Sequence, residues 1–183
     1  MKQQLKSVGI DPALVRYRAQ SALVSTALRA LGATFELVSM HSPDLAAELT
    51  RWDEGRTVCM GVLPAGPHMT FRHESGRIRF LGMVQKNPDV AMIFKNMESA
   101  VMTLTGQMGA HTASIQKRVV VHGNITHAMQ AMRAMGIVQK FLLPGLILAN
   151  TCKNPPRLTP AELLIKARVL VTLTPQLLST FVR

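Results

Sequence analysis

The spacing of apolar residues changes from helical to alternating near residue 56, and this change constrains the fold more than any other feature. Arg56–Leu63, His68–His73 and Arg77–Leu81 each show the alternation typical of β-strands, and turn-forming residues separate them. In the second and third of these strands, apolar side chains fall on one face, whereas threonine and arginine side chains fall on the other. We therefore expect a sheet with one buried face and one solvated, basic face.

Two further strands complete the expected sheet. Asp89–Lys95 carries apolar residues on both faces, so we expect it inside the sheet. Lys117–His122 forms the last strand and ends at the turn Gly123-Asn124. Between these two strands, residues 96–116 are expected to supply a helical crossover that begins with a helix capped by Asn96.

Capping signals predict two helices before the sheet. Asp11-Pro12 puts a hydrogen-bond acceptor at the N-cap and proline at the first helical position, so a helix begins here and is expected to end at Gly32. Ser42-Pro43-Asp44 repeats this signal for a second helix, which we expect to run to about Trp52. Asp53-Glu54-Gly55 then ends the second helix.

Two helices are expected after the sheet. Ile125–Lys140 has a broad apolar face that includes three methionines. Residues 141–149 are the most apolar window, but they are too few to cross a bilayer. Thr159-Pro160-Ala161-Glu162 is a capping box with proline at the first helical position, and it begins a C-terminal helix that we expect to be kinked at Pro175.

The composition indicates one folded domain that is rich in apolar residues. The chain has 183 residues, of which 48% are hydrophobic, and a chain of this length buries roughly 70% of its unfolded surface around one core. The charged fraction of 17% lies below the ~25% of typical domains. This composition excludes intrinsic disorder, and the lack of any run near ~20 apolar residues argues against an ordinary membrane-spanning helix.

The cysteines and the N-terminus bear on the cellular compartment. Cys59 and Cys152 lie 93 positions apart, and neither has a second cysteine or a histidine at a metal-ligand spacing. We therefore expect neither a disulfide framework nor a zinc site. The segment Met1–Lys6 carries positive charge but is not followed by the apolar segment of a signal peptide, so we expect a cytoplasmic protein with reduced thiols.

The net charge of +11 is concentrated in the second half of the chain. Residues 1–98 hold 12 Lys or Arg against 9 Asp or Glu, whereas residues 99–183 hold 9 against 1. Nucleic acid is not the expected partner, because aromatic residues make up only 4% of the chain and the basic runs are no longer than dipeptides. An anionic membrane surface explains the charge more simply, and a solvated basic surface that maintains solubility is the other explanation.

The common catalytic signatures do not occur in the sequence. There is no Gly-x-Gly-x-x-Gly motif, no phosphate-binding loop and no Gly-x-Ser-x-Gly motif. His122 and His127 lie near each other in sequence, but no carboxylate occurs between Glu98 and Glu162 to complete a metal site. We therefore predict no catalytic residues, no metal and no cofactor, and we do not expect an enzyme.

The order of elements from Arg56 to Lys140 resembles the sterol carrier protein type 2 family of lipid-binding domains. The most specific part is Gln116–Met132, in which a basic and apolar strand ends in Gly-Asn before a helix with small residues and a methionine face. Ile115 departs from the pattern, because the family often has an aromatic residue there. The resemblance divides the chain into an N-terminal helical extension, the lipid-binding domain, and a C-terminal lid or a segment that faces a membrane or partner; these are residues 1–40, 41–143 and 144–183.

This resemblance implies an α/β (α+β) fold and a non-catalytic carrier. The implied fold is a five-stranded, mostly antiparallel sheet covered by helices, which enclose an apolar tunnel for a fatty acyl, sterol, isoprenoid or quinone-type lipid. Eight of the twelve methionines lie within residues 83–135, and their flexible side chains suit a cavity that accepts ligands of several shapes. The other interpretation is that these methionines fill an ordinary core.

Each predicted ligand-binding residue lies on the expected inward face of its element. The set comprises Phe71, Phe80, Met92, Phe94, Val101, Leu104, Met129, Met132 and Phe141. Residues 137–149 and 163–182 are expected either to attach peripherally to an anionic membrane or to pack on the sheet as lids. The alternative function is that of an accessory subunit whose apolar helices pack on a partner enzyme or other protein without bound lipid; an RNA-binding domain ranks after it.

Overall fold

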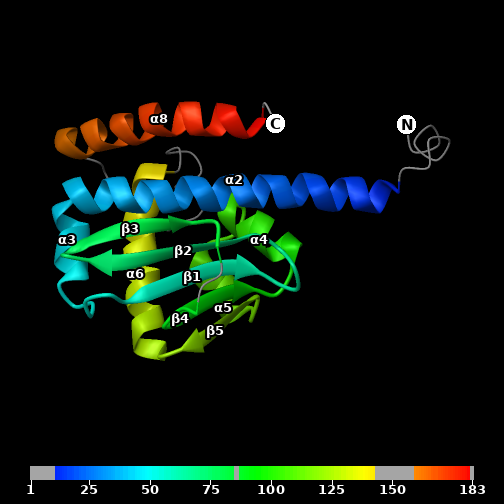
Figure 1. Cartoon of the computed structure of the whole chain (residues 1–183), viewed down its shortest axis with the longest axis horizontal. Coiled ribbons are helices and arrows are strands. Elements are labelled where there is room, and N and C mark those ends of the chain that lie inside the picture. Colours follow the sequence, from blue (N-terminus) through cyan, green and yellow to red (C-terminus); the bar gives the residue numbers. More distant parts are fainter. Residues whose placement is uncertain (1–10, 85–86, 143–158, 182–183) are drawn as a thin grey trace.

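The fold was obtained as a computed structural model, and it describes residues 11–84, 87–142 and 159–181, without the side chains of residues 110, 111, 161 and 173–181. The described elements form one sheet with helices against one of its faces and along one of its edges (Figure 1). In chain order they are α2 Pro12–His41, α3 Pro43–Leu49, β1 Thr57–Val62, β2 His68–Glu74, β3 Arg77–Gly82, β4 Val90–Phe94, α4 Met97–Leu104, α5 Ala110–Ile115, β5 Val119–Gly123, α6 Ile125–Leu142 and α8 Pro160–Phe181.

The sheet has five strands, as the sequence predicts for residues 56–123, and their order in the structure is β3-β2-β1-β4-β5. All neighbouring strands are antiparallel except β1 and β4, which are parallel. Helices α4 and α5 form the predicted crossover between β4 and β5. The predicted last strand is confirmed, because Val119–Gly123 pairs with β4.

The register of the strands gives the sheet one apolar face. Phe71 lies opposite Val58 on one side and Phe80 on the other, so these side chains share the face that the helices cover. The arginines of β3 point to the opposite face, as expected, and are exposed. Thr70 was also expected to be solvated, but it is fully buried. Its hydroxyl donates a hydrogen bond to the backbone oxygen of Val84, so the loop after β3 covers it.

Helix α2 is longer than the sequence predicts, because it continues through Gly32 to His41. The ring of Phe80 lies so close to Gly32 that a Cβ there would meet ring atoms at 2.4 Å. This glycine therefore permits close packing and does not end the helix. Phe35 lies one turn further on and stacks on Phe71 at 4.8 Å between ring centroids. Residues 1–40, which were expected to be an N-terminal helical extension, thus supply core side chains such as Phe35.

By length and composition alone, helix α2 is long and apolar enough to cross a membrane, since its most apolar 18 residues have a mean hydropathy of 1.2. However, 56% of that window is buried inside the protein. Its buried side chains pack on the sheet and the other helices, as those of a core helix do. We therefore describe α2 as the central helix of the domain.

Helix α3 begins and ends close to the predicted bounds. The hydroxyl of Ser42 accepts a hydrogen bond from the backbone nitrogen of Leu45 at 3.4 Å, which caps the helix. The helix ends at Leu49, three residues before the predicted end at Trp52. Trp52 lies after the helix, is buried, and stacks on Phe71 with ring centroids 6.4 Å apart.

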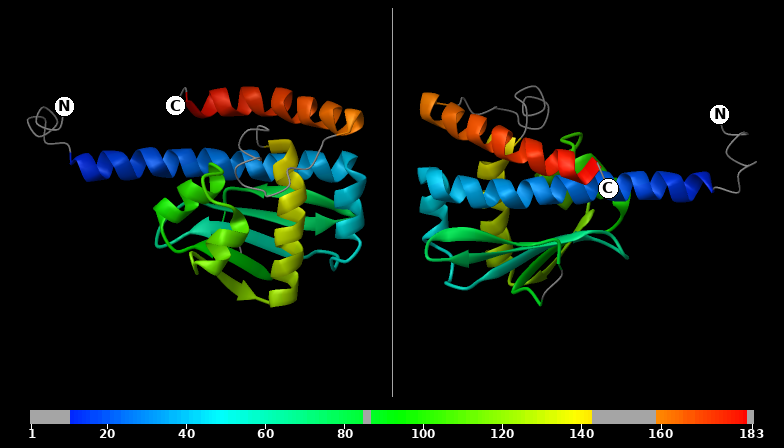
Figure 2. Two further views of the ribbon diagram at one scale, coloured as in Figure 1. Left: turned by 180° about the vertical axis from the view of Figure 1, so that it is seen from behind. Right: turned by 45° about the horizontal axis from the view of Figure 1, so that its top comes forward.

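Helices α6 and α8 complete the helical side of the domain. Figure 2 shows α6 crossing the covered face of the sheet, and α8 lying beside α2 and running in the opposite direction. Val138 and Phe141 at the end of α6 are fully buried, so this part of the predicted membrane segment 137–149 packs inside the protein; residues 143–149 lie outside the described part. Helix α8 continues without a break past Pro175, where a kink was expected.

Candidate functional site

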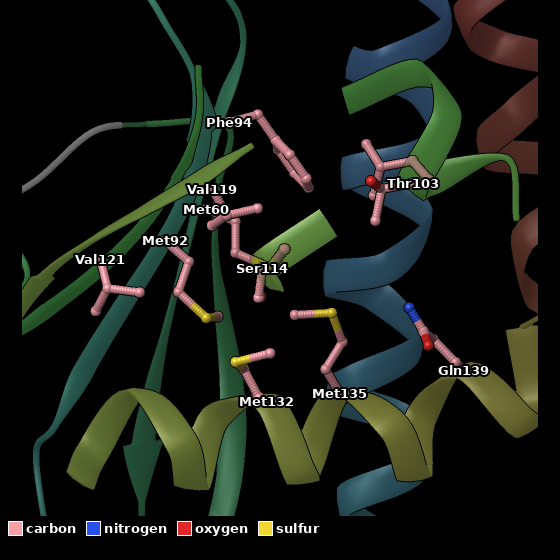
Figure 3. A pocket seen from close by; sticks show the side chains of 11 residues that line it. Met60, Met92, Phe94, Thr103, Ser114, Val119, Val121, Met132, Met135 and Gln139 are labelled. Carbon is pink, nitrogen blue, oxygen red and sulfur yellow. The ribbon is translucent and has the colours of Figure 1, made fainter. Parts of the chain in front are cut away.

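An apolar pocket lies between the covered face of the sheet and helices α4, α5 and α6. Strands β1, β4 and β5 form one wall, and α6 forms the opposite wall (Figure 3). In Figure 3 the side chains of Met132 and Met135 point from α6 towards Met60 and Met92 on the strands. The lining residues are Met60, Met92, Phe94, Thr103, Leu104, Ser114, Val119, Val121, Met132, Met135 and Gln139.

The register of the sheet brings the strand residues of this pocket together. Met92 lies beside Met60 in the parallel pair β1–β4 and opposite Val121 in the antiparallel pair β4–β5. The same face continues with Phe94 and Val119, which are also cross-strand partners. Since alternate residues of a strand share a face, these neighbours form a continuous apolar surface.

The two ends of the pocket differ in polarity. In Figure 3, Thr103 and Gln139 lie at the end away from the strands, whereas Val121 lies at the opposite end. The hydroxyl of Thr103 donates to the backbone oxygen of Ser99 at 2.9 Å, so it is oriented within α4. The pocket therefore has a wholly apolar end and an end with polar side chains.

The lining side chains nearly fill the pocket, which leaves a cavity volume of about 30 Å³. That space holds one or two water molecules, whereas ligand pockets usually measure about 300–1,000 Å³. A lipid chain can enter only if the lining side chains move apart. The four methionines on the two walls suit such a change, because their unbranched side chains have three rotatable bonds and adopt many conformations.

Four of the nine predicted ligand-binding residues line this pocket: Met92, Phe94, Leu104 and Met132. The other five lie elsewhere. Phe71 and Phe141 are in the solid core, whereas Val101 and Phe80 are partly buried against it. Met129 lies on the outer side of α6 and is 46% exposed.

The sequence prediction missed seven lining residues, and for some of them a signal was present. Met135 belongs to the methionine face of the predicted helix, and Val119 and Val121 alternate along the predicted last strand. Met60 becomes a lining residue through the parallel pairing of β1 with β4, which links segments about thirty residues apart. No local pattern marks Thr103, Ser114 or Gln139, because their place depends on how the helices pack.

Ion pairs hold α6 in the orientation that turns its methionines towards the sheet. Arg133 lies 2.9 Å from the carboxylate of Glu48 on α3, whose side chain is only 10% exposed. About two turns further along α6, Lys140 lies 3.4 Å from Asp44. These contacts fix the polar side of α6 against α3. Met132 and Met135 consequently face the pocket.

A second polar cluster joins the start of the sheet to α6. The guanidinium of Arg56 is buried, pairs with Asp53, donates to the side chain of Gln130 and lies over the ring of Trp52. The hydrogen bond and charge of Arg56 lower the pKa of Asp53 below its ordinary value. His127 lies 3.6 Å from the same carboxylate. These residues bond to one another, so the arrangement fits a structural role.

No group of three or more His, Cys, Asp or Glu side chains that could hold a metal ion occurs in residues 11–84, 87–142 and 159–181. His122 and His127, which were not expected from the sequence to bind a metal, share no carboxylate among the described residues. Asp53 contacts only the second of them. The apolar pocket is therefore the candidate site for a ligand.

Comparison with known families identifies the domain. The SCP-2 sterol transfer family matches residues 35–136, which is more than half of the chain. The chain belongs to this family. In this SCP-2 domain the matched region begins in the buried half of α2 and ends in α6, so it includes the whole sheet and ten of the eleven lining residues. Proteins of this family have a fold that generally binds lipids.

Solved structures with related folds share little sequence with this SCP-2 domain. A ubiquinone synthesis protein, UbiJ-SCP2, is 16% identical with a TM-score of 0.45, and the match covers 63% of this chain and 96% of that one. The sterol carrier protein domain 2 of Helicoverpa armigera is 17% identical with a TM-score of 0.39, over 62% and 87% of the two chains. A comparison with curated sequences gave no match.

SCP-2 domains are usually non-catalytic, although one of the matching structures is an enzyme that contains an SCP2-like part. The inverting sec-alkylsulfatase Pisa1 from a Pseudomonas species matches 68% of this chain, with 13% identity and a TM-score of 0.37. The match covers only 17% of that enzyme.

Proposed function

We propose that this protein binds an amphipathic lipid in the pocket between the sheet and α6 and carries it without changing it chemically. The observation that supports this proposal most directly is the methionine-rich pocket itself, which lies in a domain of the SCP-2 sterol transfer family. Four methionines from three elements meet there, and their flexible, polarizable side chains suit a site that accepts ligands of several shapes. The cytoplasmic location expected from the sequence stays a prediction.

The free energy for binding comes from removing the lipid chain from water. Each CH₂ group buried contributes ~0.8 kcal/mol, so a twelve-carbon chain gains on the order of 10 kcal/mol before the costs of ordering and of opening the pocket. Opening must enlarge the cavity roughly tenfold to reach the size of common ligand sites. Rotation of Met132 and Met135 away from Met92 provides part of this space at little strain, since methionine tolerates several rotamers.

The polarity of the pocket favours one orientation of the ligand. We infer that the apolar chain extends towards Val121, while a polar head group lies near Thr103 and Gln139 (Figure 3). An apolar lining discriminates weakly between chains of similar volume. Fatty acyl chains, isoprenoids, sterols and quinone-type lipids therefore remain the candidate ligands.

Native mass spectrometry of the purified protein, combined with extraction of bound lipid, tests this function. The proposal predicts one lipid per protein chain, released by organic solvent. A lipid-free protein in a stable complex with another protein would favour an accessory subunit. Co-purified nucleic acid, detected by its ultraviolet absorbance, would favour an RNA-binding role.

A further inference from the structure

The outward side of helix α8 is apolar. Leu164 and Val171 are 71% and 73% exposed, and Leu163 and Leu170 are more than half exposed. At 100° per residue, these side chains and Ala167 lie on one side of the helix. We call this set of residues the α8 face: Leu163, Leu164, Ala167, Leu170 and Val171.

Contacts on the other side of α8 keep the α8 face turned outward. Val169 is fully buried. The ammonium of Lys166 donates to the backbone oxygen of Lys140 at 3.2 Å, and Arg168 lies 3.1 Å from Nε2 of His41. These contacts attach α8 to α6 and α2. They also set one basic residue on each flank of the α8 face.

The charged residues of α8 next to the α8 face are basic. No acidic residue occurs between positions 163 and 172, and the carboxylate of Glu162 accepts hydrogen bonds from Thr159 at the start of the helix. Residues 99–183 as a whole hold nine basic residues against this single acid. An apolar helical face flanked only by basic side chains complements an anionic lipid surface.

The exposed half of α2 has the same character. Leu14, Val15 and Tyr17 are 40–47% exposed, and the two charged side chains among them are Arg16 and Arg18. Figures 1 and 2 show that this half of α2 extends past the sheet, while α8 lies alongside α2. Apolar and basic side chains are therefore exposed on both long helices.

A second copy of the chain fits the α8 face less well than a membrane does. In a twofold dimer the same surface meets itself, so the flanking Lys166 and Arg168 of one copy would approach those of the other. Repulsion between like charges opposes that contact. An anionic bilayer instead attracts both residues, while their long stems lie along the apolar layer.

We propose that the α8 face docks on an anionic membrane surface with the helix axis in the plane of the membrane. The apolar side chains enter the boundary between head groups and acyl chains, and the positive charges of Lys166 and Arg168 on the flanks of the α8 face attract the anionic head groups. This attachment is reversible and weakens with salt, because part of it is electrostatic. The proposal goes beyond lipid carriage and does not require the pocket to bind a ligand.

Vesicle flotation with the full chain tests the proposal. Vesicles of phosphatidylcholine alone are compared with vesicles that also contain phosphatidylglycerol, each at low and high salt. The variant Leu164→Gln/Val171→Gln removes apolar side chains from the α8 face. Ile125→Gln is the matched control, because Ile125 is 64% exposed but lies at the start of α6, away from α8. We expect the parent and the control to float with the anionic vesicles, less at high salt, and the double variant to bind roughly tenfold more weakly.

Three results would overturn the membrane proposal. They are equal flotation of the double variant and parent, equal binding to both vesicle types at both salt concentrations, and no flotation at all. A dimer detected by light scattering, which the double variant converts to monomer, would assign the α8 face to a second copy instead.

Circular dichroism and the thermal midpoint verify folding, and the milder Leu164→Ala/Val171→Ala repeats the test if the first variant is unfolded. Binding of a fluorescent fatty acid by the double variant is measured separately, since it reports on the pocket alone.

Discussion

The ring of Phe80 on β3 packs directly on Gly32 of α2, and its Cε2 atom lies 2.4 Å from the position that a Cβ would take. This contact explains two differences between the expected and the observed fold. Helix α2 does not end at its glycine, because the glycine serves the contact with the sheet. Phe80 lies under α2 and does not line the methionine-rich pocket.

The effect of Gly32→Ala should therefore depend on Phe80. In the parent protein the added methyl group overlaps the ring, so we expect a loss of about 1–2 kcal/mol in the free energy of unfolding. In a Phe80→Ala background the same change should stabilise by up to ~1 kcal/mol, because alanine favours the helix more than glycine does. Urea unfolding of the four proteins measures both effects. Effects of the same sign in the two backgrounds would contradict the contact.

Gly123→Ala should be strongly destabilising. Gly123 ends β5 with φ +94°, a region that alanine rarely adopts, and its added Cβ would lie 2.1 Å from the backbone oxygen of Asp89. Because a backbone atom cannot rotate away, we expect a loss of about 2–4 kcal/mol. Gly76→Ala is a useful control, since Gly76 also has positive φ but has open space around it. Thermal or urea unfolding should show a clearly larger loss at position 123.

Acid should weaken the start of the parallel pair β1–β4. The carboxylate of Asp89 accepts hydrogen bonds from the backbone nitrogen and the hydroxyl of Thr57 at 2.7 and 2.8 Å, and these bonds lower the pKa of Asp89. A pKa that is lower in the folded state stabilises above the unfolded value of ~3.9, and this stability is lost as the pH falls through the folded pKa.

Asp89→Asn tests this source of acid sensitivity. The free energy of unfolding of the parent should decline below about pH 5. The variant should decline less steeply, because asparagine keeps an acceptor oxygen but does not titrate. Asp53 and Glu162, whose pKa values are also lowered, leave part of the slope in both proteins. Identical pH profiles of the two proteins would show that Asp89 contributes nothing.

Cys59 should be unreactive in the folded protein. Its side chain is fully buried, and burial raises the pKa of the thiol, so little thiolate forms near neutral pH. In a Cys152→Ser background, we expect a disulfide reagent to modify Cys59 at least roughly a hundredfold more slowly than in urea. Equal rates in the two conditions would mean that the outer side of β1 is open to the reagent.

Much of the fold can be predicted because its signals are local. The alternation in β2 and β3 and the cap residues Asp11 and Ser42 each act within a few residues of their element. The parallel pairing of Met60 with Met92 joins segments separated by a hairpin, so no local pattern contains it. The burial of Thr70 likewise depends on a contact with the loop after β3.

The pocket was predicted less completely for the same reason. Periodicity gives the side of an element that faces inward, and Met92 and Met132 were found in this way. It does not distinguish a residue that lines the pocket from one that fills solid core, as Phe71 and Phe141 do. That distinction depends on where α4, α5 and α6 cross the sheet, which is set by tertiary packing.

The most direct test of the proposed lipid site compares tryptophan at two methionines of α6. Met132 lines the pocket, whereas Met129 lies one turn earlier and is 46% exposed. A lipid chain can enter only if the side chain at position 132 moves out of its way, and the larger, less flexible indole would fill the space that the chain needs. Titration with a fluorescent fatty acid should show at least roughly tenfold weaker binding for Met132→Trp and unchanged binding for Met129→Trp, with both variants folded by circular dichroism. If Met132→Trp binds the fatty acid as tightly as the parent, the lipid does not occupy this pocket.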